Sequence, residues 1–419
     1  MIRRKSSRLL AAVSLWLAAC SSTPPPKPPP QAADDSPTPD DTLVKPRVMD
    51  DGVIAGIFAK DKKFYEKFLA DEEKLRLEVL YTQIDGDKVT RHGYRADLEY
   101  FYPASAVKPA LAIAALESLR EKNIETKAPF RVFTLGLTGM EERDGSGNRL
   151  NVQREIEKLL VFSDNDSYNR LYSIVGQREA NTRMWRMGLD SVRIRTRLMA
   201  SQSDDGSRTP RVDWVNDQGQ AVVTLDERTS TLNLPPPGVV ETDIGVQHIG
   251  PSGEVVAKPM AFAERNRISL VDLQDMLALI VRPDLATVLG HKDVPQIRDA
   301  DREMLLTALA AWPSHVAGGN SPDMQPLDEL HKPALAGALK SGRPLKVYSK
   351  AGRAYGFLVE NACIVDREAH KGIFLTMNIF VGEGNVVGDD KYPYEDGMPF
   401  LIRTAELVTK HAFGEKKKK

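Results

Sequence analysis

The feature that most constrains this chain is a short polar turn that runs directly into a long apolar helix. Residues 102–108 read YPASAVK, and residues 109–116 read PALAIAAL. If the helix begins near Ser105, Lys108 lies one turn further along the same face, because residues three apart are neighbours on a helix surface. The pattern therefore predicts a hydroxyl and a buried amine held side by side.

Ser105 and Lys108 have the side chains of a nucleophile and its base. Serine is a weak nucleophile at neutral pH and needs an activating base. Lysine can be that base when burial or a neighbouring cation lowers its pKa. The structural alternative is that Ser-x-x-Lys arises by chance and that the serine only caps the helix.

Two later motifs carry related side chains. Residues 163–165 read SDN, so a hydroxyl and a carboxamide can face one site while the aspartate braces the loop. The structural alternative is a helix cap made by these same residues. Residues 349–352 read SKAG, in which Lys350 can hold an anion and Gly352 lets a ligand approach the backbone. The structural alternative for this lysine is a charged residue at a strand edge.

The composition excludes several other classes of function. A net charge of -1 gives no reason to expect a nucleic-acid partner. Cys20 and Cys363 are the two cysteines, and no Cys/His cluster has metal-ligand spacing, so we expect neither a metal nor another cofactor. His92 and His291 are isolated in the sequence, which is typical of surface or packing residues.

The order of elements indicates an α+β fold. A hairpin is expected over 75–94 with a glycine turn, and three strands are expected near the end of the chain, over 344–350, 355–366 and 372–382. Helices are expected over 105–123, 155–162, 166–175, 180–187, 270–281, 299–311 and 397–413. This order predicts one antiparallel sheet built from both chain ends, helices packed on it, and a helical second lobe.

The first residues form a targeting segment. A basic start and a short apolar run over 9–19 lead to LAAC, which resembles a bacterial lipobox. The resemblance implies cleavage before Cys20 and a lipid on that cysteine. Ser21 stands where an inner-membrane retention signal would have Asp, so we expect the periplasmic side of the outer membrane. An uncleaved anchor or an ordinary signal peptide is the alternative.

These features divide the chain into four parts. Residues 1–19 are the signal peptide, and residues 20–47 are the lipidated cysteine and a proline-rich linker. Residues 48–415 are expected to form one domain with an insertion at about 200–265, and residues 416–419 form a basic tail. The insertion is rich in Asp, Pro, Gly and Thr, and loops of this length are uncommon without a role.

Taken together and in this order, the three motifs resemble those of the penicillin-recognising serine hydrolases, the class A β-lactamases and penicillin-binding proteins. The resemblance covers roughly residues 75–413. It implies that Ser105 is the nucleophile and that Lys108 is its base or proton relay. It further implies that Ser163 relays a proton to the leaving group and that Lys350 sets the field around Ser163.

The same resemblance implies which residues bind the substrate. Asn165 would hydrogen-bond the substrate amide, and the backbone N–H groups of Ser105 and Arg353 would form the oxyanion hole. Donors of that kind contribute about 3 kcal/mol each to the transition state. Ser349 and Gly352 would complete the wall of the site. The implied partner is a small-molecule or peptidoglycan-like amide or ester.

The chain departs from the family pattern at two places. Ala351 stands where a Thr or Ser hydroxyl normally helps to bind the β-lactam carboxylate, and Arg353 is a possible substitute. The deacylating glutamate of class A enzymes is missing, because residues 195–202 contain no Glu. Thr229 stands in the glutamate position before a later Leu-Asn pair, and Glu227 is two residues out of register.

Two functions are therefore compatible with the sequence. The first is a periplasmic serine hydrolase or acyltransferase that forms an acyl-Ser105 intermediate, reacts with β-lactams and deacylates poorly. The second is a non-catalytic cell-envelope binding lipoprotein that retains the fold. Neither the physiological substrate nor the oligomeric state follows from the sequence.

Overall fold

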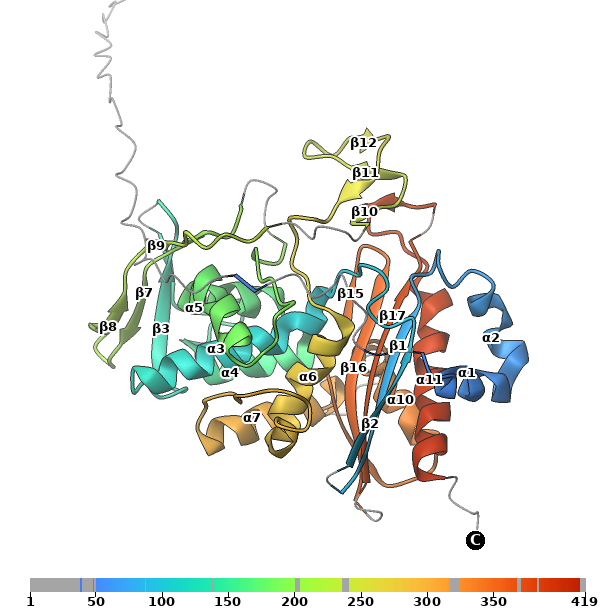
Figure 1. Ribbon diagram of the computed structural model, residues 1–419. Helices are drawn as coiled ribbons and strands as arrows, with labels where there is room; N and C mark the ends of the chain where they lie inside the picture. The colour runs from blue at the N-terminus through green and yellow to red at the C-terminus, as the bar shows by residue number, and fades with distance from the viewer. Residues whose placement is uncertain are drawn as a thin grey trace, which may run out of the picture.

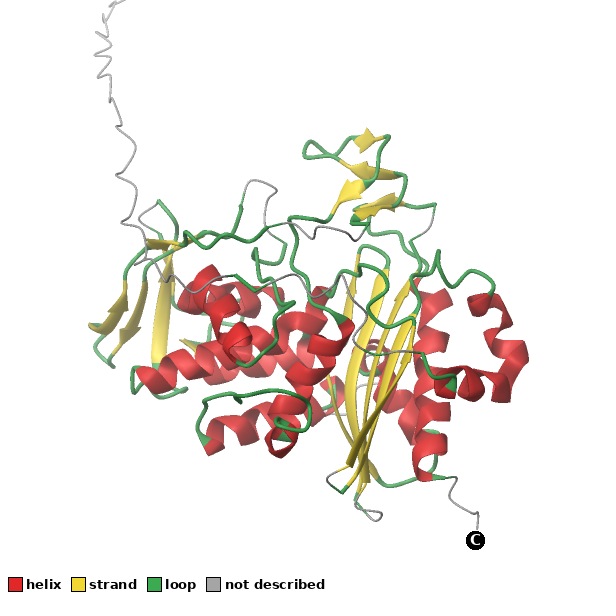
Figure 2. Cartoon of the chain, in the orientation of Figure 1, coloured by secondary structure: helices red, strands yellow, loops and turns green. Residues whose placement is uncertain are grey.

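The computed structural model describes residues 38–39, 48, 50–86, 88–136, 139–199, 204–235, 241–316, 325–367, 371–382 and 384–414. The predicted signal peptide, the predicted lipidation site Cys20 and the basic tail lie outside these residues. Within them, a lobe built on a large sheet lies beside a mainly helical lobe (Figures 1 and 2). The α+β fold predicted from the order of elements is confirmed.

The helices are α1 (Val53–Phe58), α2 (Lys62–Leu69), α3 (Lys108–Glu121), α4 (Val152–Glu157), α5 (Asn165–Arg186), α6 (Leu270–Val281), α7 (Asp299–Ala310), α8 (Pro313–Val316), α9 (Gln325–His331), α10 (Pro333–Leu339) and α11 (Tyr394–Phe413). Four shorter helical turns are η2 (Ala59–Asp61), η3 (Ala104–Val107), η4 (Lys158–Phe162) and η5 (Pro283–Leu285). Among the described helices, none is both long enough and apolar enough to cross a membrane.

The strands of the main sheet are β1 (Glu78–Asp85), β2 (Lys88–Tyr94), β14 (Leu345–Ser349), β15 (Gly352–Ala354), β16 (Phe357–Asp366) and β17 (Lys371–Phe380). The remaining strands are β3 (Pro129–Phe133), β4 (Met140–Glu141), β5 (Leu150–Asn151), β6 (Arg208–Thr209), β7 (Val212–Val215), β8 (Ala221–Leu225), β9 (Arg228–Thr229), β10 (Asp243–Ile244), β11 (Gln247–Ile249), β12 (Val255–Val256), β13 (Met260–Ala261) and β18 (Val386–Val387).

The main sheet joins the two ends of the domain. Its strand order is β14-β16-β17-β1-β2, with β15 paired to β16, and the neighbours are antiparallel. Glu78 of β1 lies opposite Asn378 of β17. The predicted sharing of one sheet by early and late strands is confirmed.

Two apolar layers cover the sheet. One contains buried residues of α1, α2, α10 and α11 together with one face of the strands. The other contains α3, α5 and α6 and continues into the helical lobe. Helix α3 is buried along most of its length, which explains its unbroken Ala, Leu and Ile sequence. The first motif lies at the N-terminal end of this central helix, where the chain reaches the surface between the lobes.

One continuous segment, residues 196–264, which we call the excursion, reaches both lobes (Figure 1). Its strand β7 pairs with β3 of the helical lobe, and its strand β11 pairs with β18, which follows the main sheet. The predicted insertion at about 200–265 corresponds to this segment. The pairing at each end means that the excursion bridges the two lobes.

The neck of the excursion is closed by buried polar contacts. The backbones of Arg193 and Arg267 exchange hydrogen bonds of 2.9 and 3.0 Å. The amide oxygen of Asn266 accepts from the backbone N–H groups of Arg195 and Thr196 at 2.7 and 3.0 Å. Since each of these groups is satisfied only while the two strands of the neck lie together, the contacts fix where the excursion leaves and re-enters the domain.

Helix α5 agrees with the expectation of two helices, over 166–175 and 180–187, because it is kinked between them. It is one element with a break at Gly176, whose φ of 79° and ψ of 164° are not helical. Arg228 of the excursion donates to the carbonyl of Ile174 at 2.7 Å, next to the break. This arginine, from a distant segment, satisfies a helix carbonyl beside the break.

Two glycine substitutions provide a test of the packing of α10 against α11. A Cβ at Gly337 would collide with the carbonyl oxygen of Ile402, and it would lie 2.8 Å from Ala405 Cβ. We expect Gly337→Ala to lower the free energy of unfolding by about 2 kcal/mol, because overpacking forces the two helices apart. Gly56 lies in α1 with open space around its Cβ position, so Gly56→Ala should raise that free energy by about 0.5–1 kcal/mol. Urea denaturation measures both changes, and equal effects in the two variants would contradict the packing.

Candidate active site

Ser105 lies in a strained turn at the start of α3. The 3₁₀ turn η3 contains the serine, and Ala104 before it has a φ of 46° in the left-handed region that disfavours alanine. Ser105 is partly exposed, whereas both of its neighbours are buried. Its side chain caps no helix, since neither η3 nor α3 has a side-chain cap. The turn thus presents a hydroxyl to the space between the lobes.

Lys108 is fully buried and is held by the second motif. Its Nζ donates to the carbonyl of Ser163, to Asn165 Oδ1 at 2.7 Å, and to Asp164 O and Ser163 Oγ at 3.3 Å each. Among the hydrogen bonds of the described residues, none joins this amine to Ser105 Oγ. Catalytic contacts of this kind are often long until a substrate is bound.

Burial makes the ammonium group of Lys108 lose its proton more easily, so that its amine can act as a base. Desolvation lowers the pKa of its ammonium from the ordinary 10.5 to about 7, and the charge of Asp164 opposes the shift. Around neutral pH, a large fraction of this amine is therefore unprotonated. This value fits the range in which a general base is effective.

In the second motif, Asp164 caps a helix, and Ser163 and Asn165 contact Lys108. The π-helical turn η4 ends at Ser163, whose φ of 59° is left-handed. Asp164 caps α5 by accepting from the backbone N–H of Ser167 at 2.6 Å. This cap leaves Ser163 and Asn165 directed at Lys108 from either side of the aspartate.

Lys350 brings the third motif to the same hydroxyl. Its Nζ donates to Ser163 Oγ at 2.9 Å and to Ala351 O at 2.8 Å. Burial lowers its pKa well below the ordinary value, and the charges of Lys108 and Lys332 act in the same direction. Ser163 Oγ therefore lies between two buried amines, a position suited to passing a proton.

Because Gly352 has no side chain, the third motif can pack closely against the turn of Ser105. A Cβ at this position would collide with Pro103 O, and it would lie 2.8 and 3.0 Å from the backbone nitrogens of Ala106 and Ser105. Only glycine lets strand β15 approach the turn so closely. The next residue, Arg353, has an exposed side chain whose guanidinium lies 5.1 Å from the centre of the Tyr394 ring.

A third buried lysine supports the strand that carries Lys350. Lys332 Nζ donates to the carbonyl of Ser349 at 2.5 Å and to Leu309 O at 2.7 Å. Ser349 itself has a fully buried side chain, and it is the carbonyl that makes this contact. Nearby Glu360 accepts from the backbone N–H groups of Ala334 and Asn361 at 3.0 Å each.

Lys332 and Glu360 are mutually dependent buried charges. Burial lowers the pKa of Lys332 to about 8 and raises the pKa of Glu360 to about 7, while the opposite charge of each limits the shift of the other. His331 lies beside them, and burial together with the charges of Lys350 and Arg353 lowers its pKa to about 4. The imidazole is thus neutral at physiological pH.

The carboxylate of Asp164, next to Ser163, serves as a helix cap. Asn169, one turn after Asn165, binds the main chain of Leu198 through both groups of its amide, at 2.9 and 3.0 Å. Leu198 is buried and cannot take a proton. Glu227 forms an ion pair of 2.6 Å with Arg208 on the excursion.

Hydrogen bonds join the predicted site residues Lys108, Ser163, Asn165 and Lys350 in one cluster, and Ser105 lies one turn before Lys108 with its backbone against Gly352. The arrangement supplies a nucleophile, two buried amines and a hydroxyl relay, which suits acyl transfer without a metal among these side chains. Sequence reasoning missed Lys332, Glu360 and His331. A signal existed for Glu360, since it is the acidic residue within the apolar stretch of β16.

His92 and His291 make structural contacts. His92 Nδ1 lies 2.6 Å from Asp51 Oδ2, and the buried His291 bridges Met187 O and Asp275 at 2.8 and 2.9 Å. The interpretation of both histidines as packing or surface residues agrees with these contacts.

Comparison with known proteins supports the fold. Residues 62–229, about two-fifths of the chain, match the model of a family described as the beta-lactamase enzyme family. This stretch contains the first two motifs and ends before Lys350. No curated protein matches the chain significantly.

Solved structures with a similar fold cover most of the chain at low identity. A beta-lactamase from Desulfarculus baarsii is 15% identical with a TM-score of 0.50, over 87% of this chain and 99% of that one. PBP-A is 12% identical (TM-score 0.47, 80% and 89% covered), as is the chromosome-encoded beta-lactamase of Vibrio parahaemolyticus (0.46, 83% and 98%). The predicted resemblance to β-lactamases and penicillin-binding proteins is confirmed, and the chain has their fold.

The buried state of Lys108 predicts how stability varies with pH. Its pKa of about 7 in the folded chain lies below the ordinary 10.5 of an unfolded chain, so protonation favours unfolding and stability is lost as the pH falls toward 7. We expect the free energy of unfolding of Lys108→Met, relative to the wild type, to rise by about 2 kcal/mol between pH 9 and pH 7. Denaturant titrations at several pH values measure this difference.

The control for the change in net charge is Lys63→Met, which removes an exposed lysine of α2. A Lys108→Met difference that does not depend on pH, or that falls as the pH is lowered, would contradict the assignment of a desolvated amine.

Proposed function

We propose that this protein is a serine hydrolase or acyltransferase of the β-lactamase-like type, which attacks an amide or ester through an acyl-Ser105 intermediate. The observation that carries the proposal is the convergence of two buried amines, Lys108 and Lys350, on Ser163 Oγ beside the strained turn of Ser105. A merely structural site would gain nothing from desolvating two ammonium groups, each at a cost of several kcal/mol.

The proposed acylation step uses these groups in order. The unprotonated amine of Lys108 takes the proton of Ser105 Oγ as that oxygen bonds to the substrate carbonyl carbon. The carbonyl oxygen becomes an oxyanion, which backbone N–H groups of Ser105 and Arg353 would stabilise. When the tetrahedral intermediate collapses, the bond to the leaving group breaks, and Ser163 gives that group a proton drawn from the lysines.

Release of the acyl group is expected to be slow with a β-lactam. Hydrolysis requires a base that activates water against the ester of Ser105, and residues 195–202, where class A enzymes carry their deacylating glutamate, contain no Glu. The protein should therefore trap penicillins better than it destroys them. Turnover would remain possible with an amide or ester whose leaving group leaves the site after acylation. It would also remain possible with an acceptor molecule that enters the site and takes the acyl group from Ser105.

The location is proposed from the sequence of residues 1–20. A basic, apolar and small-residue pattern ending at Cys20 favours a lipid-anchored protein on the periplasmic side of the outer membrane. The proline-rich linker would let the domain stand off from the membrane. Its substrates would then be peptidoglycan-like or small amides and esters of the cell envelope.

Covalent labelling is the direct test of the nucleophile. We expect intact-mass spectrometry of the purified chain to show one adduct with benzylpenicillin and one with a fluorophosphonate, both absent from Ser105→Ala. The penicillin adduct should persist for minutes or longer, because residues 195–202 carry no glutamate to activate water. Absence of both adducts from the wild type would favour the non-catalytic binding lipoprotein instead.

The rate of labelling should depend on pH through Lys108. Since the pKa of its ammonium is about 7, the unprotonated fraction rises about tenfold between pH 6 and pH 8. The second-order rate of fluorophosphonate labelling should rise by the same factor and then level off. The probe has no group that titrates in this range, so a flat profile, or one that falls with pH, would contradict the role of Lys108 as base.

A further inference from the structure

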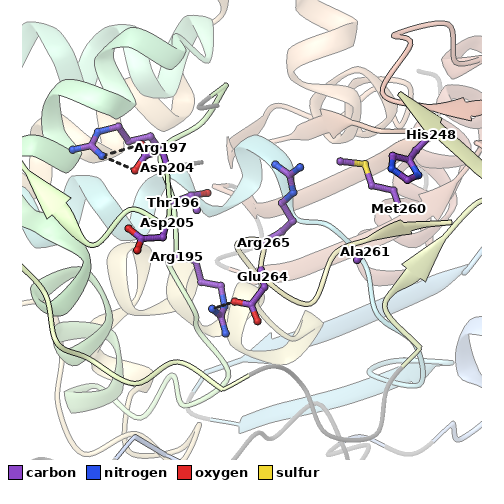
Figure 3. Close-up of a pocket in the computed structure, with 10 residues that line it drawn as sticks. All are labelled: Arg195, Thr196, Arg197, Asp204, Asp205, His248, Met260, Ala261, Glu264 and Arg265. Carbon is purple, nitrogen blue, oxygen red and sulfur yellow. Dashed lines mark hydrogen bonds and ion pairs between the residues drawn. The ribbon is translucent and has the colours of Figure 1, made fainter. Parts of the chain in front are cut away.

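A chamber of about 440 Å³ is lined by residues of the excursion and of its neck (Figure 3). Its lining comes from both strands of the neck and from two separate stretches of the excursion. The lining residues are Arg195, Thr196, Arg197, Asp204, Asp205, His248, Met260, Ala261, Glu264 and Arg265. The chamber is therefore a feature that this long segment adds to the fold.

Two of the three arginines in the chamber are neutralised. Arg195 pairs with Glu264, and Arg197 pairs with Asp204 at 3.1 Å (Figure 3). Within the described ranges, Arg265 has no carboxylate partner. Its guanidinium instead lies over the face of Tyr355, 5.7 Å from the ring centre, and in Figure 3 it points away from both ion pairs. The chamber thus holds one cation that is free to bind an anion.

An aromatic cluster connects Arg265 with the nucleophile. Tyr355 lies in the turn between β15 and β16, the strands that follow Lys350. Its ring is 5.4 Å from Tyr102, three residues before Ser105, and 5.3 Å from Phe262 of the excursion. Arg265 and the turn that carries Ser105 therefore pack against one aromatic cluster, which connects the chamber with the nucleophile.

We propose that the chamber binds a carboxylate on a part of the substrate remote from the reacting carbonyl, and that Arg265 is its anchor. The inference rests on the proposed function for the identity of the reacting end. A planar guanidinium stacked on a tyrosine is preorganised to bind a carboxylate through two parallel hydrogen bonds.

Asp205 restricts the kinds of ligand that the chamber can bind. It is exposed on the chamber wall, where its Oδ1 accepts from the backbone N–H of Ser207 at 2.8 Å. Its carboxylate would accept from an N–H group of the ligand and would repel a simple polyanion. The combination of one free guanidinium and one exposed carboxylate fits an amino-acid or peptide carboxylate, which carries both an anion and N–H donors.

The test measures binding to Ser105→Ala, so that turnover does not intervene. The ligands are alanylalanine dipeptides with the same free C-terminus and an N-terminal acyl cap. One series has caps that end in a carboxylate (succinyl, glutaryl, adipyl and suberyl), and a matched series has methyl-ended caps of equal length. Isothermal titration calorimetry should show about tenfold tighter binding of the carboxylate cap at its best length.

Arg265→Gln in the same background should reduce this preference to near unity. The matched control is Arg208→Gln, which removes an arginine of the excursion that pairs with Glu227 and does not line the chamber. The control should keep the tenfold preference. Thermal unfolding of each variant establishes that it is folded.

The outcomes separate the two proposals. If no cap length shows a preference, or if Arg265→Gln keeps it, the inference about the chamber is overturned, whatever Ser105 does with acylating probes. If the preference is present and depends on Arg265 while the wild type forms no adduct with either probe, the chamber stands as a carboxylate site and the proposed hydrolase function fails.

Discussion

The site depends on keeping two ammonium groups away from water. Lys108 and Lys350 are both buried, and both reach Ser163 Oγ, and the charge of Lys108 adds to the burial that lowers the pKa of Lys350. Burial alone lowers the pKa of a lysine, and a second cation lowers it further. The fold supports this unfavourable arrangement with an apolar central helix on one side and the Lys332 contact to Ser349 on the other.

Close contacts between backbone segments fix the geometry of the site around Ser105. The turn of Ser105 includes a strained Ala104, and strand β15 lies against that turn because Gly352 has no side chain. The excursion then closes the region from outside through its neck at Asn266. Strain at the nucleophile, the close approach at Gly352 and the fixed neck each restrict the backbone from which the site is built.

Much of this arrangement was readable from the sequence, because the signals are local. The hairpin expected over 75–94 with a glycine turn corresponds to β1 and β2, and the helix expected over 270–281 is α6. The order of the three motifs predicts that Ser105 and Lys350 meet. Each of these predictions needs only neighbouring residues or a known order.

The remaining features depend on contacts between distant segments. Lys332 and His331 lie next to a proline in an ordinary-looking stretch, and only the fold places them beneath Lys350. The break at Gly176 is stabilised by Arg228 from the excursion. The strands of the excursion are too short to show periodicity, so its chamber and the free cation at Arg265 could not be predicted from pattern.

The pairing of β1 with β17 has a consequence for the route to the folded state. Glu78 and Asn378 are partners although about 300 residues separate them, and β17 lies between β16 and β1 at the centre of the sheet. Closing such a loop is entropically costly and slows folding. Until the last strands are in place, β1 and β2 form an open-edged hairpin whose apolar face has no cover. The protein must therefore assemble its active site late, as a single event that waits for nearly the whole chain.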